Sequence, residues 1–133
     1  MVAPTRAALR KVTLNAARSK EFPGGSIRHG YDFIAPLTAD GHIDLESWKQ
    51  HRGECFAHRF WGDELAMRGL LIHHAGGRGG STWAFEWKGG TKEAEEEEGF
   101  RFGDHAFKVG EYVSVREEDG ELQTFRVVSV GQP

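Results

Sequence analysis

Short stretches in which apolar and polar residues alternate recur along most of this 133-residue chain, separated by turns rich in glycine and proline. Alternation with a period of two is typical of β-strands that bury one face. The stretch KVTLNAA places Val12, Leu14 and Ala16 on one face, and it predicts a first strand.

The segment EFPGGS then predicts a turn, because glycine and proline interrupt regular structure. The following stretch YDFIAPL predicts a second strand with Tyr31 and Phe33 on one face. Pro36 either ends this strand or sets it at a sheet edge, since proline cannot donate to a β-ladder.

One short helix is predicted over about Asp44–Arg52. Asp44 is suited to the cap position, where its carboxylate accepts bonds from free amide groups. Ile43 before the cap and Trp48 inside the helix can pack together as a hydrophobic staple. Gly53 stands where glycine commonly ends a helix. We expect the side that carries Trp48 to pack on the sheet.

Two further strands, ECFAHRFW and the residues around 70–75, are predicted to form a hairpin through a three-residue loop at 62–64. A loop of odd length brings the same faces of the two strands together. The expected inward-facing row comprises Phe56, His58, Phe60, Leu70, Ile72 and His74.

The next hairpin contains three aromatic residues at alternate positions, Trp83, Phe85 and Trp87. A six-residue loop over 75–80 would place Ile72 opposite Trp83 and Leu70 opposite Phe85. With such partners, we expect the aromatic row to belong to the core rather than to an exposed stacking platform.

Residues 88–99, KGGTKEAEEEEG, are predicted to be a flexible acidic loop, because five neighbouring glutamates repel one another and favour solvation. Strand character resumes with Phe100 and Phe102.

The final hairpin, EYVSVREEDGELQTFRVVSV, is the clearest element in the sequence. A three-residue turn over 118–120, with Gly120 left-handed, brings the face of Val113 and Val115 together with the face of Phe125 and Val127. The competing Asp-Gly turn would instead set Val115 opposite a polar threonine.

These elements predict a mainly β fold, an antiparallel meander of seven or eight strands that forms a small barrel or strongly curved sheet, with the helix packed on it. We expect a single domain over 1–133, with residues 1–8 able to fray. A hydrophobic content of 38% and a charged content of 28% suit a soluble globular protein.

Basic residues concentrate at the start of the chain. Residues 1–20 contain five arginines and lysines and no acid, whereas the remainder has 12 basic and 20 acidic residues, for a net charge of −3. An acidic body disfavours broad nucleic-acid binding, although the basic segment keeps that alternative open. A single cysteine, Cys55, permits no internal disulfide and suggests the cytoplasm. No stretch is long and apolar enough to predict a membrane span.

Seven histidines invite a metal hypothesis, but no zinc-site or catalytic motif supports it, and we predict neither a metal nor a cofactor. His58 and His74 share the predicted inward row, so a small metal-dependent or general-base enzyme with Glu54 or Glu86 stays an alternative. Cys55 is predicted to be a buried structural residue.

The segment FKVGEYVSVREEDGELQTFRVVSV resembles a phrase of SH3-like and PUA-like small β-barrels, which implies a barrel fold and no particular site. The chain from RKVTLNAARSKEFPGGSIRHGYDFIAPL to FRVVSV resembles short uncharacterised proteobacterial proteins. That resemblance implies a bacterial intracellular protein and assigns no functional residue.

The sequence therefore favours a non-enzymatic binding or interaction module that uses a barrel groove. Its partner would be a small molecule or a protein, with a homodimer open and neither a membrane nor nucleic acid expected. The candidate ligand-binding residues are His58, His74, Arg78, Trp83 and Trp87.

Overall fold

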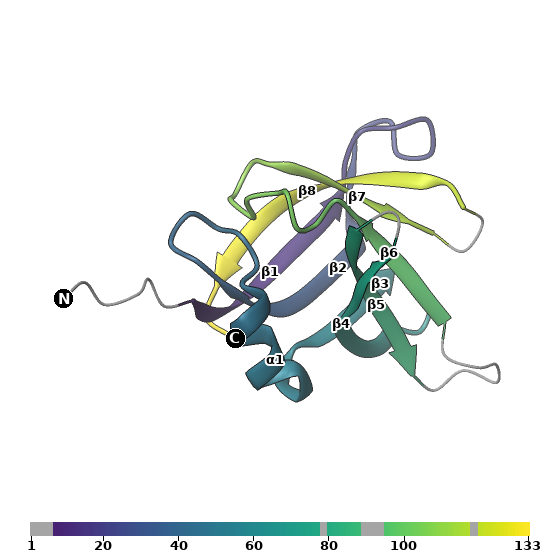
Figure 1. Cartoon of the computed structure of the whole chain (residues 1–133). Helices are drawn as coiled ribbons and strands as arrows, with labels where there is room; N and C mark the ends of the chain where they lie inside the picture. The colour runs from purple at the N-terminus through teal and green to yellow at the C-terminus, as the bar shows by residue number, and fades with distance from the viewer. Residues whose placement is uncertain (1–6, 78–79, 89–94, 118–119) are drawn as a thin grey trace.

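The computed structural model describes residues 7–77, 80–88, 95–117 and 120–133, and every structural statement below concerns these residues. Eight antiparallel strands follow one another around a closed barrel, and the last pairs with the first (Figure 1). The predicted fold class is confirmed. The elements are β1 (Ala8–Ala16), β2 (Ser26–Leu37), α1 (Leu45–His51), the 3₁₀ turn η1 (Arg52–Glu54), β3 (Phe56–Trp61), β4 (Met67–Gly77), β5 (Gly80–Lys88), β6 (Glu95–Phe100), β7 (Tyr112–Arg116) and β8 (Leu122–Gly131).

Aromatic rings fill the barrel interior. Tyr31 and Phe33 project inward from β2, as predicted, and each lies against Phe85 of β5, with ring centroids 5.2 and 5.3 Å apart. The ring of Phe125 meets Tyr31 edge-on at 5.1 Å. Such contacts add specific aromatic attraction to the burial of large apolar surfaces. The predicted inward row of β1, formed by Val12, Leu14 and Ala16, is also buried.

The last hairpin has the predicted register. Val113 pairs with Phe125, and the amide of Glu117 donates to the carbonyl of Glu121 at 3.0 Å, as a three-residue connection requires. Gly120 has a φ of +84°, the left-handed conformation that the turn needs. The other turn residues, 118 and 119, lie outside the described part of the chain.

Helix α1 lies at the end of the barrel opposite the β1–β2 turn (Figure 1). Its cap is confirmed, since the Asp44 carboxylate accepts from the Ser47 amide at 2.9 Å. Trp48 is buried and donates from Nε1 to the Leu71 carbonyl of β4 at 3.0 Å, which fixes the helix on the sheet. The predicted ending at Gly53 is wrong, because Gly53 continues into η1 without a left-handed φ. No helix in the described ranges is long and apolar enough to cross a bilayer.

The predicted inward row of β3 and β4 faces outward instead. The pairing of Phe56 with Leu70 has the expected even register, yet Phe56 is 51% exposed while Ala57 and Leu71 are fully buried. Ala57 is a small residue that faces inward where aromatic rings of the other strands already occupy the interior. Thus Ala57 stands beside Phe33 of β2.

The register predicted for β4 and β5 is wrong by one residue. Leu71 pairs with Phe85, and His73 rather than Ile72 pairs with Trp83. The two strands continue to a Gly77–Gly80 pair, and a bulge beyond His74 absorbs the extra residue, so there is no six-residue loop.

The acidic segment is not wholly a loop. Residues 89–94 lie outside the described chain, but Glu95–Phe100 forms β6, and Glu97 is buried within the barrel. A strand over 100–102 is also incorrect, because Phe102 lies in a turn after β6 and buries its ring over Gly99. The barrel needs β6 to join β5 to β7, and this closure outweighs the repulsion between the glutamates.

Two strand glycines allow backbones to approach closely. A Cβ on Gly30 would lie 1.8 Å from the Leu14 carbonyl oxygen, and one on Gly69 would lie 1.9 Å from that of Glu86. These positions mark sharp bends of a small barrel, where only glycine fits. Pro36 lies beyond the last β2–β3 pair, on a part of β2 that pairs with β1 and bridges to Ile43 at Leu37.

Candidate functional site

His58 and His74 do not form a common site. His58 Nδ1 lies 2.8 Å from Asp32 Oδ1, and His74 Nε2 lies 2.6 Å from Glu96 Oε1. His58 pairs with Arg68, and His74 lies six residues farther along β4, a distance of about 20 Å at the usual rise per residue. In the described chain, no group of three His, Cys, Asp or Glu residues could hold a metal ion.

The predicted stacking residues belong to the core. Trp83 is 4% exposed and Trp87 is 3% exposed, so neither ring offers a face to a ligand from solvent. The core prediction is therefore confirmed, and the alternative of a platform is wrong.

Arg78 lies outside the described residues. Glu54 is exposed at the end of η1, and Glu86 is half-buried on β5.

Cys55 is a buried, free thiol, as predicted. Burial raises the pKa of its thiol to about 11, and the negative charge of Glu54 adds to the increase. A rise of about two pH units in thiol pKa lowers the reactive thiolate fraction about 100-fold.

We therefore expect native Cys55 to react with a thiol reagent such as DTNB at pH 8 at least 100-fold more slowly than the urea-unfolded chain. Because the folded pKa is raised, the native thiol should gain reactivity only as the pH approaches 11. Stopped-flow absorbance measures both rates. A Ser129→Cys variant, with its new thiol at an exposed position, is the fast-reacting control. Equal rates for native and unfolded Cys55 would contradict the structure.

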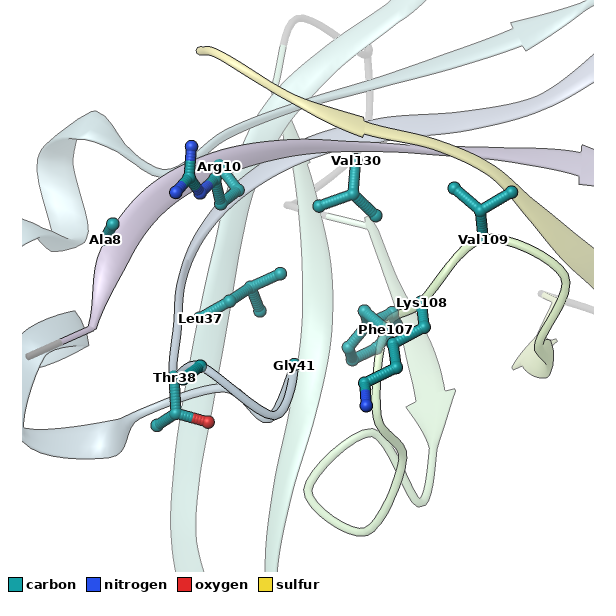
Figure 2. A pocket seen from close by; sticks show the side chains of 10 residues that line it. Ala8, Arg10, Leu37, Thr38, Gly41, Phe107, Lys108, Val109 and Val130 are labelled. Carbon is teal, nitrogen blue, oxygen red and sulfur yellow. The ribbon is translucent and has the colours of Figure 1, made fainter. Parts of the chain in front are cut away.

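A pocket of about 430 Å³ lies where the start of β1, the end of β2, the end of β8 and the segment before β7 meet. Its volume is within the range of small-molecule sites. Figure 2 shows Leu37, Phe107 and Val130 between Arg10 on one side and Lys108 on the other. The inner surface is therefore apolar and its opposite sides are cationic.

Hydrogen bonds hold the pocket walls together. The turn after β2 closes with the Thr38 amide donating to the His42 carbonyl at 2.8 Å. Gly41 has a φ of +90° in this turn, and its carbonyl accepts from the Phe107 amide at 2.8 Å. The Leu37 and Phe107 side chains are nearly fully buried. The pocket is thus preformed, because the turn after β2 and the segment before β7 are joined by a hydrogen bond.

The pocket is electrostatically positive. Its described lining includes Arg10 and Lys108 but no Asp or Glu, and neither cation forms an ion pair with any described residue. The nearby Asp40 interacts within its own turn, with the Thr38 hydroxyl and, at 3.1 Å, with His42 Nδ1. Those contacts, the Thr38 hydroxyl first, lower the pKa of Asp40 to about 2.

A cluster of polar side chains lies inside the barrel, around Glu97 of β6. Its Oε1 accepts from Trp87 Nε1 at 2.9 Å and from the Tyr31 hydroxyl at 3.0 Å, and lies 3.7 Å from Arg59 Nε. The Arg59 guanidinium also stacks on Trp61, 4.2 Å from the ring centroid. Burial and then the charge of Glu97 raise the pKa of Tyr31, so its hydroxyl keeps the proton that it donates.

Sequence reasoning missed both the pocket with its two cations and the polar cluster around Glu97. The pocket residues come from four separate segments, and none of them belongs to a local motif. Glu97 stands within a run of glutamates that gives no reason to single it out, except that its alternate neighbour Gly99 would share its face if 95–100 were a strand.

Comparison of the chain with known protein families, with curated proteins and with solved structures found no match. The resemblances to SH3-like and PUA-like barrels and to proteobacterial proteins therefore stay predictions.

Proposed function

We propose that this protein is a non-enzymatic binding module, and that the pocket at the end of its barrel holds a small organic anion with an apolar body. The observation that carries this proposal is the pairing of an apolar interior with two cations, Arg10 and Lys108, that have no carboxylate partner in the described chain. A carboxylate of the ligand would supply that partner.

The apolar body of the ligand would contact Val109 and Val130, which line the pocket and keep exposed surface above the buried Leu37 and Phe107. Burial of apolar surface there contributes affinity. The described lining contains no imidazole, thiol or carboxylate, the groups that most often act as bases or nucleophiles. This composition favours binding over catalysis. A medium-chain carboxylate such as octanoate combines the two required features and fits a pocket of this size.

We expect octanoate to shift the amide signals of Gly41, Phe107 and Val130 in ¹⁵N-labelled protein. The double variant Arg10→Gln/Lys108→Gln should weaken binding about tenfold, because it removes two charge-assisted contacts at partly exposed positions. NMR titration at millimolar ligand measures both effects, and 1-octanol reports the affinity of the apolar body without its charge.

Lys11→Gln is the matched control, since Lys11 is an exposed neighbour of Arg10 on β1 that does not line the pocket. It should bind octanoate like the unmodified protein. The proposal fails if octanoate leaves the pocket amides unshifted, or if the double variant and the control bind equally well.

The other functional alternatives have less support. A metal-dependent or general-base enzyme centred on His58 and His74 would need imidazoles that converge, and these two have separate carboxylate partners. The single free thiol of Cys55 is consistent with a reducing compartment, and we propose the cytoplasm as the place where the module acts.

A further inference from the structure

A second hollow, of about 270 Å³, lies on the wall of the barrel where the end of β1 and the β1–β2 turn meet β8 and the start of β7. The β1–β2 turn projects beyond the barrel at this end (Figure 1). We call this hollow the bulge groove and define it by the five large side chains that line it: Arg18, Ile27, Tyr112, Arg126 and Val128.

An interruption of the β1–β2 ladder explains the groove. Asn15 pairs with Gly30, but the next residue of β1, Ala16, pairs with Ser26. The intervening residues 27–29 therefore have no partner on β1, whereas His29 pairs with Trp61 on β3. This part of β2 stays with β3 and separates from β1. Bulges of this kind redirect side chains and are frequent at functional sites.

Exposed apolar side chains gather in the bulge groove. Ile27 is 81% exposed, Tyr112 is 57% exposed and Val128 is 36% exposed. Single exposed apolar residues are ordinary, as Leu65 in the β3–β4 turn illustrates. Three that line one concave surface indicate a surface that a partner covers.

The charge of the groove limits the chemistry of that partner. Arg18 and Arg126 line it, and its described lining contains no Asp or Glu. Neither arginine forms an ion pair within the described residues, and the only hydrogen bond that Arg18 makes there is one of 3.4 Å to the Pro23 carbonyl. Two guanidinium groups beside apolar side chains complement a ligand that carries carboxylates beside apolar groups.

We propose that the bulge groove binds a short acidic peptide segment of a partner protein, one that carries an Asp or Glu close to an aliphatic or aromatic side chain. The barrel is closed, and the β2 edge that the bulge leaves unpaired at the groove spans only residues 27–29, so the peptide is recognised through its side chains rather than by strand addition. A groove of this size places the interaction in the weak, transient class.

The same surface is less suited to nucleic acid. The chain has 20 acidic and 17 basic residues, and the groove supplies only two cations. A nucleic-acid groove needs clustered positive charge along a backbone of repeating phosphates. Ile27 and Val128 would face hydrated phosphates without any compensating contact.

Panning of phage-displayed random heptapeptides on the immobilised full chain tests this proposal. The enriched peptides should carry Asp or Glu within about three positions of an aliphatic or aromatic residue. A synthetic peptide of the most enriched sequence should bind at least tenfold more weakly to Arg18→Gln/Arg126→Gln, and at least fivefold more weakly to Ile27→Ser, in fluorescence anisotropy.

The controls are Leu65→Ser, which removes an exposed apolar side chain elsewhere, and Arg10→Gln/Lys108→Gln, which removes two cations from the separate pocket. Both should bind the peptide as the unmodified chain does. The proposal is overturned if no peptide is enriched, if enriched peptides lack carboxylates, or if the groove variants bind normally. Binding of a short oligothymidylate that depends on Arg18 and Arg126 would also overturn it, in favour of nucleic acid.

Discussion

Substitution of Gly30 by alanine should destabilise the barrel by about 3 kcal/mol or more. The new Cβ would lie 1.8 Å from the Leu14 carbonyl oxygen and 3.1 Å from the Phe60 ring. A ring can move, but the carbonyl belongs to the paired backbone of β1, so relief requires β1 and β2 to separate. Urea unfolding followed by tryptophan fluorescence measures the loss.

Gly24→Ala is the matched control, because a Cβ at Gly24 meets no atom within 4 Å. Its effect should stay within about 0.5 kcal/mol. Gly69→Ala should resemble Gly30→Ala, since its Cβ would lie 1.9 Å from the Glu86 carbonyl oxygen. A Gly30→Ala variant as stable as Gly24→Ala would show that the strands do not approach as described.

Replacement of Glu97 by alanine should cost about 3–5 kcal/mol of unfolding free energy. The change leaves the donors of Trp87 and Tyr31 without the acceptor that they share, and it leaves Arg59 without the carboxylate 3.7 Å away. Buried donors that lose their partner keep the full cost of desolvation. The same urea titration measures this loss.

Glu97→Gln separates hydrogen bonding from charge. Its amide oxygen can still accept from Trp87 and Tyr31, so the expected loss is smaller, about 1–3 kcal/mol. Glu96→Ala is the control on the same strand, because the exposed Glu96 side chain pairs, among the residues that the structure describes, with the partly exposed His74 alone. Such a contact is worth at most about 1 kcal/mol. If Glu97→Ala and Glu96→Ala cost the same, Glu97 is not the centre of the buried polar group.

The fold class could be predicted because local signals agreed with the overall structure. In the last hairpin, the turn length and the valine alternation selected the same register, which the Val113–Phe125 pair confirms. The Asp44 cap was readable for the same reason. Where local contacts between a side chain and the nearby backbone determine a turn or a helix cap, the sequence is sufficient to predict it.

The sequence predictions were wrong where contacts with distant strands of the barrel set the orientation or the register of a residue. Ala57 faces inward and Phe56 outward because the interior is already filled from other strands, a condition that no local alternation reveals. The bulge beyond His74 likewise changed which residue pairs with Trp83. The candidate pocket could not be predicted at all, since Arg10 and Lys108 come to line one pocket only after the barrel has formed.

Closure of the barrel by β1 and β8 has a consequence for synthesis of the chain. Val12 and Val130 are direct partners, so β1 leaves the ribosome well before β8 and must wait for it before its second edge is paired. Until then β1 exposes amide and carbonyl groups on which another nascent chain could pair. The closed barrel thus forms only after β8 has been synthesised, and the interval before β8 emerges is when the barrel strands are most exposed to misassembly.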